Sequence, residues 1–475
     1  MLFPTVTFAI FFAFVLPASW LLMPHGTRWR LFVIAASYFF YGYWDWRFAF
    51  LLGASTLWNQ VWAHTIHRLR GDRSRRIALI AAVAGNLGVL GWFKYYRFFT
   101  VSATNLLGEL GIHVSPRILS VTLPVGISFF TFQALSYVID VYRREIEPVS
   151  FLDFALFVSF FPQLVAGPIV RASEFLPQLR RRHDPRRADA SKAFFLIMAG
   201  LFKKVVLANF LATTIVDEVF GLPEHHSSIE ILVGVYAYAV QIYCDFSGYT
   251  DIAIGIALLL GFRFPQNFDA PYTAVSLQDF WRRWHMTLSR WLRDYLYIPL
   301  GGNRGSRNRT HRNLMLTMLL GGLWHGAAWT FVVWGGIHGG VLVFEQRRRE
   351  RLEDAGLEPP PDTLGRRVVG RLVTFHIVCL AWIFFRSPDF TIARTMLTRL
   401  ATAWGDPSPL VTGSVLLAVA VGVLMQYTPS GVIERSQIVL SRLSPVATGL
   451  VLAVGLLVID ALGPQGVAPF IYFAF

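Results

Sequence analysis

Long apolar runs without a charged side chain dominate the sequence. Eight of them approach or exceed the roughly 20 residues that an α-helix needs to cross a bilayer. They cover residues 1–27, 48–67, 77–93, 118–139, 154–170, 313–344, 407–433 and 443–459. This pattern predicts an all-α, polytopic membrane protein.

Five further apolar stretches, which are shorter or interrupted by charged residues, bring the expected total to about 10 to 13 membrane segments. They cover residues 31–44, 193–216 (interrupted by Lys203 and Lys204), 231–262 (interrupted by Asp245 and Asp251), 372–385 and 461–475. Some are too short or too polar to span alone, and lipid cannot satisfy a broken backbone. Such segments line a cavity or are enclosed by other helices, so we expect a lumen inside the bundle.

Composition supports this class and excludes others. Hydrophobic residues make up 54% of the chain and charged residues 15%, whereas soluble domains carry about 25% charged residues. The net charge of +14 is concentrated in the connectors 67–76, 179–187, 281–312 and 346–371. Excess Lys and Arg in connectors is typical of the cytoplasmic side of a membrane protein, and no nucleic-acid-binding motif accompanies it.

The domain organisation expected from this pattern is one integral-membrane domain over residues 1–475. The connector 346–371 contains EPPPDTLG and many charges, so we expect a cytoplasmic, non-helical linker there. Helices in 372–475 follow it. The amino-terminal stretch has no basic residue before Arg28, so we expect a retained first membrane helix rather than a cleaved signal peptide. The two cysteines, Cys244 and Cys379, cannot form a four-thiolate metal site, and we expect no metal.

The segment 276–305 predicts an amphipathic helix at the membrane interface. Ser276 and Asp279 fit a capping box at its start, and Pro299 followed by two glycines ends it. A helical projection places its tryptophans on one face and four arginines on the opposite face, namely Arg282, Arg283, Arg290 and Arg293. His285 projects to the border of the apolar face, so its imidazole is expected to point into protein or lipid.

Two further histidines, His325 and His338, lie in the charge-free run 313–344. An ionisable group at membrane depth is costly and by default indicates function, so His325 becomes the first candidate. His338 cannot share a proton with it unless the helix breaks at Gly335 and Gly336. His285, arriving from another helix, is therefore the expected partner of His325.

A neutral imidazole in a dry tunnel suits acyl transfer to a hydroxyl. Near pH 7 it accepts a proton from an alcohol, and exclusion of water protects an activated acyl donor from hydrolysis. His325 would act as a general base or as a transient nucleophile that carries the acetyl group, and both roles stay open.

Five sequence stretches resemble the membrane-bound O-acyltransferase family. They are LPVGISFFTFQALSYVIDVYR (123–143), FPQLVAGPIVR (161–171), QIYCDFSGYTDIAIGIALLLGFRFPQNFDAPY (241–272), FWRRWHMTLSRWLRDYLYIPLGGNRG (280–305) and GGLWHGAAWTF (321–331). The motif-bearing core thus covers about 123–344, and the carboxy-terminal PFIYFAF also fits. Within the family the chain resembles the membrane subunit of bacterial alginate O-acetylation.

This resemblance implies a bundle of about eleven transmembrane and re-entrant helices around a central tunnel, with His325 as the catalytic residue and His285 as the second active-site position. It implies a multi-pass protein of the bacterial inner membrane that takes acetyl groups from a cytoplasmic donor, acetyl-CoA, and delivers them for O-acetylation of a polysaccharide such as alginate. It also implies a separate periplasmic or membrane-anchored acetyltransferase of the serine-hydrolase-like type as a partner, and no tightly bound cofactor.

The residues add a binding hypothesis for that donor. The arginines Arg282, Arg283, Arg290 and Arg293, in a segment expected to face the cytoplasm, would attract the phosphates of acetyl-CoA. Part of this charge reflects membrane topology. The acids Asp245 and Asp251 lie six residues apart, which disfavours a carboxylate dyad, and we expect them to pair with arginine or to line the tunnel.

Alternatives from other classes remain at this point. A transporter or acyl-group relay would use broken helices and buried histidines as a path, and it predicts internal pseudo-symmetry, for which no repeat is visible. A non-catalytic assembly subunit would tolerate loss of His325 and His285. Within the family, acetylation of cellulose or peptidoglycan and D-alanylation of teichoic acids are neighbouring possibilities, the last disfavoured by the match at 280–305.

Overall fold

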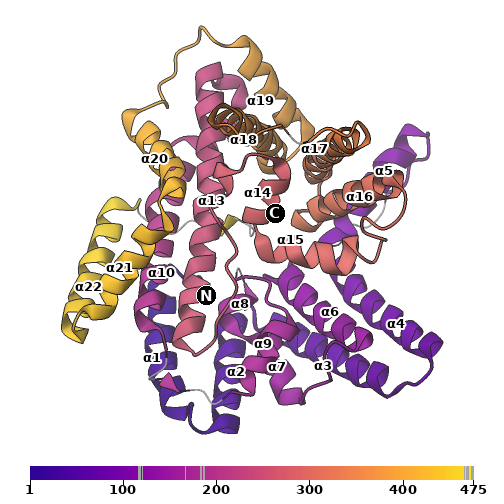
Figure 1. Ribbon diagram of the computed structural model, residues 1–475, viewed down its shortest axis with the longest axis vertical. Helices are drawn as coiled ribbons and strands as arrows, with labels where there is room; N and C mark the ends of the chain where they lie inside the picture. The colour runs from indigo at the N-terminus through magenta and orange to yellow at the C-terminus, as the bar shows by residue number, and fades with distance from the viewer. Residues whose placement is uncertain are drawn as a thin grey trace. The chain divides into compact units, whose positions relative to one another are not determined.

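The structure is a computed structural model that describes all residues except 116–118, 120, 166, 182–183, 186–187, 359, 465, 467–469 and 472–475. Regular structure in the described residues is helical, without a β-strand (Figure 1). The chain forms two compact units. Unit 1 contains Met1–Ala190 and Ile256–Pro265, and unit 2 contains Ser191–Gly255 and Gln266–Phe475.

Unit 1 is built from the amino-terminal helices. They are α1 (Val6–Leu22), α2 (Gly26–Gly42), α3 (Trp46–Arg68), α4 (Asp72–Leu90), the π-helical turn η1 (Gly91–Tyr95), α5 (Tyr96–Glu109), α6 (Ile127–Arg143), α7 (Phe151–Ser159), α8 (Phe161–Leu164) and α9 (Ala172–Leu179). Helix α3 packs against α4 and α6. The core is rich in phenylalanine, as in the parallel stack of Phe175 on Phe262 with ring centroids 4.6 Å apart.

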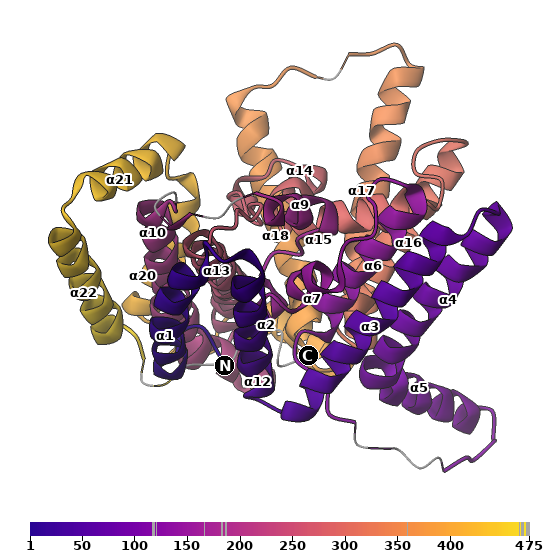
Figure 2. The same cartoon turned by 90° about the horizontal axis from the view of Figure 1, so that it is seen from below.

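Unit 2 carries the candidate site. Its first part comprises α10 (Ala190–Leu201), η3 (Phe202–Ala208), α11 (Asn209–Leu211), η4 (Ala212–Val216), α12 (Asp217–Gly221), η5 (Pro223–His225) and most of α13 (Ser228–Leu259). Its second part comprises η6 (Pro271–Thr273), α14 (Leu277–Arg283), α15 (Met286–Leu292), η7 (Arg293–Tyr297), α16 (Arg307–His325), α17 (Trp329–Asp354), α18 (Leu364–Arg386), α19 (Phe390–Thr402), α20 (Gly413–Leu424), η8 (Met425–Tyr427), α21 (Ser430–Arg442) and α22 (Pro445–Leu462). Helices α20 to α22 lie beside α10 in both views (Figures 1 and 2).

Helices α16 and α17 form a closely packed hairpin. A Cβ atom at Gly335 would collide with the carbonyl oxygen of Met318, and one at Gly322 would collide with that of Phe331. The glycines therefore let the two backbones approach each other, as small residues do between membrane helices. Close helix packing accounts for both glycines.

Five helical segments of the described residues are long and apolar enough to cross a membrane. They are Asp72–Glu109, Ala190–Gly221, Ser228–Leu259, Leu364–Arg386 and Pro445–Leu462. A sixth span results if α20 and α21, which are bent by 89°, are counted together. This confirms a multi-pass, all-helical membrane protein, while the count of about eleven helices stays a prediction.

The structure corrects two predicted segments. The run 313–344, expected as one apolar segment, is divided between α16 and α17 at Gly326–Ala328, and α17 continues through Gly335 and Gly336. The connector is shorter than predicted, because α17 continues to Asp354 and α18 begins at Leu364. The carboxy-terminal end of α17 is largely exposed, so its charged side chains remain in contact with solvent. A helix can therefore include these charged residues.

Candidate functional site

His325 is the last residue of α16 and lies among aromatic rings. Only 3% of the residue is exposed, and its backbone is followed by the extended Gly326. Its ring centroid lies 5.0 Å from Trp324, 5.0 Å from Trp334 and 5.2 Å from Phe385, each in an edge-on arrangement. The helix end thus holds the imidazole inside the protein.

His285 sits at a break in the predicted amphipathic helix. Helix α14 ends at Arg283 and α15 begins at Met286, so the prediction of one continuous helix over this segment was wrong. His285 has a positive φ of 42°, a conformation that L-residues rarely adopt. The break turns its side chain fully into the interior, with no exposed surface.

Asn267 explains this local geometry. Its backbone carbonyl accepts from the Met286 N–H at 2.9 Å, and its side-chain oxygen accepts from both the Thr287 N–H at 3.0 Å and the Thr287 hydroxyl at 2.8 Å. The same Oδ1 lies 3.2 Å from His285 Nδ1. Asn267 therefore fixes the start of α15 and the His285 ring together.

These contacts determine which nitrogen of His285 carries the proton. A backbone N–H can only donate, so the Asn267 atom that faces Thr287 must be the oxygen. His285 Nδ1, facing the same oxygen, must then be the protonated nitrogen. Burial lowers the pKa of His285 to about 3, so the ring is neutral and Nε2 keeps a free lone pair. Nε2 is buried without a hydrogen-bond partner in the described structure.

His338 has the opposite tautomer. Its Nδ1 accepts from the Trp281 indole N–H at 3.2 Å, so the ring proton resides on Nε2. That Nε2–H is buried and has no hydrogen-bond partner among the described residues. The His338 ring lies 4.6 Å from Trp334, the same indole that contacts His325.

The structure brings the sequence-predicted histidines into one aromatic cluster. The Trp324 ring lies 5.0 Å from His325 and 6.1 Å from His285, so this indole links the two predicted site residues. Trp334 links His325 to His338 in the same way. Sequence reasoning missed Asn267, Trp281 and Trp334, although all three lie in or beside the motifs that carry the family resemblance.

The predicted donor-binding arginines are divided among α14, α15 and η7. Arg283 pairs with Asp279 at 2.9 Å, and Arg293 pairs with its neighbour Asp294 at 2.6 Å. Arg282 is exposed and Arg290 is half-buried. Arg293 lines a cavity of 460 Å³ together with residues of α17.

Both acids inside the apolar stretch 231–262 are paired with lysine rather than arginine. Lys204 Nζ lies 2.6 Å from Asp245, with both side chains almost fully buried, and Lys203 contacts Asp251. Asp245 also accepts from the Ile471 backbone N–H at 2.7 Å. Of the motif PFIYFAF (469–475), the structure describes Phe470 and Ile471, and the other five positions lie outside the described residues.

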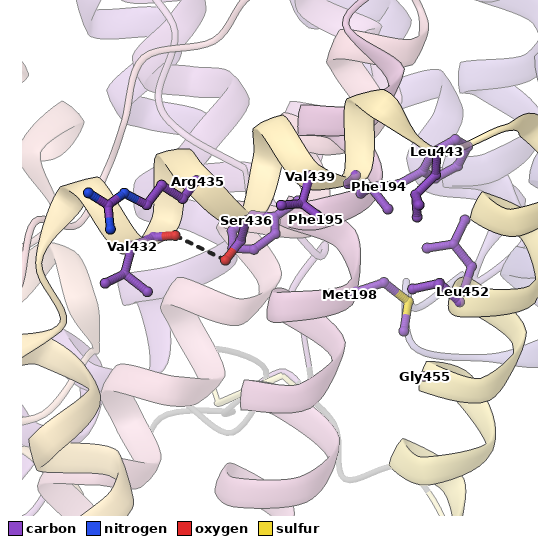
Figure 3. Close-up of a pocket in the computed structure, with 12 residues that line it drawn as sticks. Phe194, Phe195, Met198, Val432, Arg435, Ser436, Val439, Leu443, Leu452 and Gly455 are labelled. Atoms are coloured by element: carbon purple, nitrogen blue, oxygen red, sulfur yellow. Dashed lines mark hydrogen bonds between the residues drawn. The ribbon is translucent and has the colours of Figure 1, made fainter.

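The cavities lined by described residues include the following three. One of 690 Å³ lies between α10, α21 and α22 in unit 2 (Figure 3), one of 460 Å³ lies beside η7 and α17, and one of 540 Å³ lies on α1 and α2 in unit 1. His325 lines none of the three. The tunnel to His325 therefore stays a prediction.

Sequence comparisons place this chain in a known family. The model of the family described as "MBOAT, membrane-bound O-acyltransferase family" matches residues 90–364, which include the three histidines of the aromatic cluster, His285, His325 and His338. A "Probable alginate O-acetylase AlgI" of Azotobacter vinelandii is 38% identical over 383 residues, covering 79% of this chain and 73% of the relative. A "Peptidoglycan O-acetyltransferase" of Helicobacter pylori is also 38% identical, over 78% of this chain and 73% of the relative.

A more distant relative has a different printed activity. The "Teichoic acid D-alanyltransferase" of Streptococcus thermophilus is 28% identical over 351 residues, covering 69% of this chain and 80% of the relative. Helical architecture, apolar spans, family match and relatives agree. The chain belongs to the membrane-bound O-acyltransferase family, and it is an O-acyltransferase of the membrane.

Proposed function

We propose that this protein transfers acetyl groups from a cytoplasmic thioester, acetyl-CoA, to a polysaccharide on the outer side of the bacterial inner membrane. The observation that carries this proposal is the buried cluster of His325 and the neutral His285, because an unprotonated imidazole away from water suits transfer of an activated acyl group. Relatives named for alginate and peptidoglycan O-acetylation support a polysaccharide acceptor.

The chemistry assigned to His325 has two forms. As a general base, it removes the proton of an acceptor hydroxyl, whose oxygen attacks the thioester carbonyl; the carbon–sulfur bond breaks and the thiolate takes up the proton. As a nucleophile, its ring nitrogen attacks the carbonyl first, the carbon–sulfur bond breaks, and the thiolate takes up the proton that the acetylated ring loses and leaves as the thiol. The acceptor hydroxyl then displaces the imidazole from the acetyl group, and the hydroxyl proton passes to the freed ring nitrogen. His285 Nε2 serves as a proton acceptor or positions the thioester. Rapid denaturation near neutral pH during turnover distinguishes the two forms, since the second leaves acetyl label on the protein and an acetyl-imidazole is hydrolysed in acid.

Delivery to the polymer is proposed to involve a partner. A separate periplasmic or membrane-anchored acetyltransferase of the serine-hydrolase-like type would receive the acetyl group and place it on the polysaccharide. The four arginines proposed for the donor phosphates have unequal support, and Arg293 is the best placed because it lines the 460 Å³ cavity. No tightly bound cofactor is proposed.

The test uses the full-length protein in proteoliposomes with labelled acetyl-CoA outside and an acceptor polysaccharide, with its partner enzyme, inside. We expect label on the acceptor with the unsubstituted protein and none with His325→Ala. His376→Ala is a matched control, because His376 is an exposed histidine on α18 that bonds Tyr236. An active His325→Ala protein overturns the assignment, and free acetate or unreacted donor crossing the bilayer without acceptor labelling supports a transporter instead.

A further inference from the structure

The largest of the three cavities lies between α10 and α22 in unit 2. Helix α22 is in close contact with η3, the continuation of α10, at its carboxy-terminal end, where a Cβ at Gly463 would lie 2.6 Å from the side chain of Val205. Nearer the beginning of α22 a space of 690 Å³ remains, and α21 crosses over it (Figure 3). Its lining includes Phe194 and Met198 of α10 and Leu452 of α22. This volume is typical of sites for small molecules, which measure about 300–1,000 Å³.

The surroundings of this cavity are apolar. Apart from Arg435 and Ser436, the described residues that line it are apolar. Helix α22 is long and apolar enough to span a membrane, and its residues Leu450, Val454 and Leu457 are each more than half exposed. An exposed apolar span faces the hydrocarbon of the bilayer rather than water. The cavity therefore lies on a lipid-facing side of unit 2, and its occupant must be largely apolar.

Arg435 adds a positive charge to the apolar lining. Val432, Arg435 and Val439 are spaced i, i+3 and i+7 on α21, so they share one face of the helix. The Ser436 hydroxyl donates to the Val432 carbonyl at 3.0 Å, so it is satisfied within the helix (Figure 3). The Arg435 guanidinium is exposed and has no ion pair or hydrogen bond within the described residues. A guanidinium binds phosphate through two parallel N–H groups, so this face suits an occupant with a phosphate at one end.

The arginine also lies where lipid headgroups are expected. Helix α21 is bent by 89° from the apolar α20, so it runs along the membrane surface, as interfacial helices do. The basic connector 179–187 and Lys192 come directly before the part of α10 that lines the cavity. Basic connectors are typical of the cytoplasmic side, whose leaflet carries anionic phospholipids. The apolar lining, the arginine and the position at the surface together match a phospholipid with a net negative headgroup.

We propose that this site, here called the α21 cavity, binds one anionic phospholipid. Arg435 binds the phosphate, and an acyl chain lies between Phe194 and Met198 of α10 and Leu452 of α22. A membrane helix fits less well, because membrane helices pack through small residues, and the space at Gly455 is already occupied by Met198 Cε, 2.6 Å from the position of a Cβ. The lipid thus joins α22 to α10, and this role does not depend on acyl transfer.

The first test measures headgroup selectivity on the delipidated, full-length protein in detergent. Fluorescent phosphatidylglycerol is anionic, and phosphatidylethanolamine with the same acyl chains has no net charge. Arg435→Gln is expected to lower the selectivity for phosphatidylglycerol by about fivefold, since one cation near the membrane surface contributes about this factor. Arg435→Lys keeps the charge and should retain the selectivity. Arg442→Gln is the matched control, because Arg442 is an exposed arginine of the same helix outside the cavity lining.

The second test blocks the place of the acyl chain. Leu452→Trp fills part of the cavity and should weaken binding of both phospholipids by about fourfold or more, the loss expected for even one methylene group. Leu457→Trp is the control, because Leu457 lies on the same helix and is 69% exposed. A photo-crosslinker, p-benzoyl-phenylalanine in place of Val451, identifies the occupant in cells. An adduct with the mass of a phospholipid supports the proposal, whereas an adduct with a second copy of the chain or with another protein overturns it.

Three binding results would also overturn the α21 cavity as a lipid site. They are equal affinity of the unsubstituted protein for both phospholipids, equal loss of selectivity in Arg435→Gln and Arg442→Gln, and unchanged binding in Leu452→Trp. Thermal unfolding of each variant shows that it is folded. Because the two tests use different helices, failure of one variant to fold leaves the other test decisive.

Discussion

Substitution of Asn267 tests whether the site depends on one tautomer of His285. Asn267→Ala removes the oxygen that accepts from His285 Nδ1, from the Thr287 N–H and from the Thr287 hydroxyl. Three hydrogen bonds at about 1 kcal/mol each predict a loss of about 3 kcal/mol in the free energy of unfolding. Without that oxygen the ring proton is free to occupy Nε2, which removes the lone pair from the site.

The kinetic effect follows from the role of that lone pair. General base catalysis contributes about 10²- to 10⁴-fold to a rate, so kcat of Asn267→Ala is expected to fall by about 100-fold or more. KM for acetyl-CoA should change little, because the hydrogen bonds of Asn267 go to His285 and to the start of α15. Steady-state acetyl transfer in proteoliposomes measures both constants, and thermal unfolding in nanodiscs measures the change in stability.

Asn267→Asp and Thr287→Val are the matched variants. A carboxylate still accepts from Nδ1, so Asn267→Asp should recover most of kcat. Its negative charge favours the imidazolium and raises the pKa of His285 above its value of about 3 in the unsubstituted protein. The neutral base is then lost as pH falls through the raised pKa, so activity on the acidic side disappears at a higher pH than in the unsubstituted protein.

Thr287→Val removes one hydrogen bond to the same oxygen and leaves the His285 contact in place, so it should cost about 1 kcal/mol of stability with kcat within about threefold. An Asn267→Ala protein with nearly full kcat would refute the tautomer argument. So would an Asn267→Asp protein as inactive as Asn267→Ala when both are folded.

Two further predictions concern stability and use thermal unfolding in detergent. Lys204→Met leaves the buried Asp245 carboxylate without its cationic partner and should cost about 3–5 kcal/mol in the free energy of unfolding, while addition of Asp245→Asn should restore part of this loss. An unchanged melting temperature for Lys204→Met would contradict the buried ion pair. Gly335→Ala places a Cβ against the Met318 carbonyl and should lower the free energy of unfolding by about 1–3 kcal/mol. The control Gly340→Ala has open space and should leave the stability unchanged or raise it. Equal effects of both substitutions would contradict the close packing of α16 against α17.

The candidate residues could be named from the sequence because burial of a histidine in a charge-free segment is costly wherever the segment folds. His325 and His338 were visible in this way, and His285 was visible from its place beside an apolar face. Their arrangement was not predictable. The projection of His285 assumed one regular helix, and the positive φ at this residue redirects its side chain. That conformation depends on contacts with Asn267, which is eighteen positions earlier in the chain.

The pairing of the buried charges could also be predicted only in part from the sequence. Asp245 and Asp251 required compensation once they were placed in an apolar helix, and the sequence supported that conclusion. Their partners are Lys203 and Lys204, which lie on another helical segment. The lysines were visible as interruptions of an apolar stretch, but which cation meets which acid depends on how α13 packs against η3.

The sequence by itself determined that this protein lies in a membrane, that it is all-helical, and which polar residues are buried at a cost. It could do so because hydrophobicity and the free-energy cost of burying a charge act on each segment separately. Only the tertiary structure decided that Trp324 and Trp334 link the histidines, and that Asn267 and Trp281 give His285 and His338 opposite tautomers. These features depend on distances and directions between atoms of different helices. Such relations arise only when the helices pack, so no periodicity or composition of a single segment contains them.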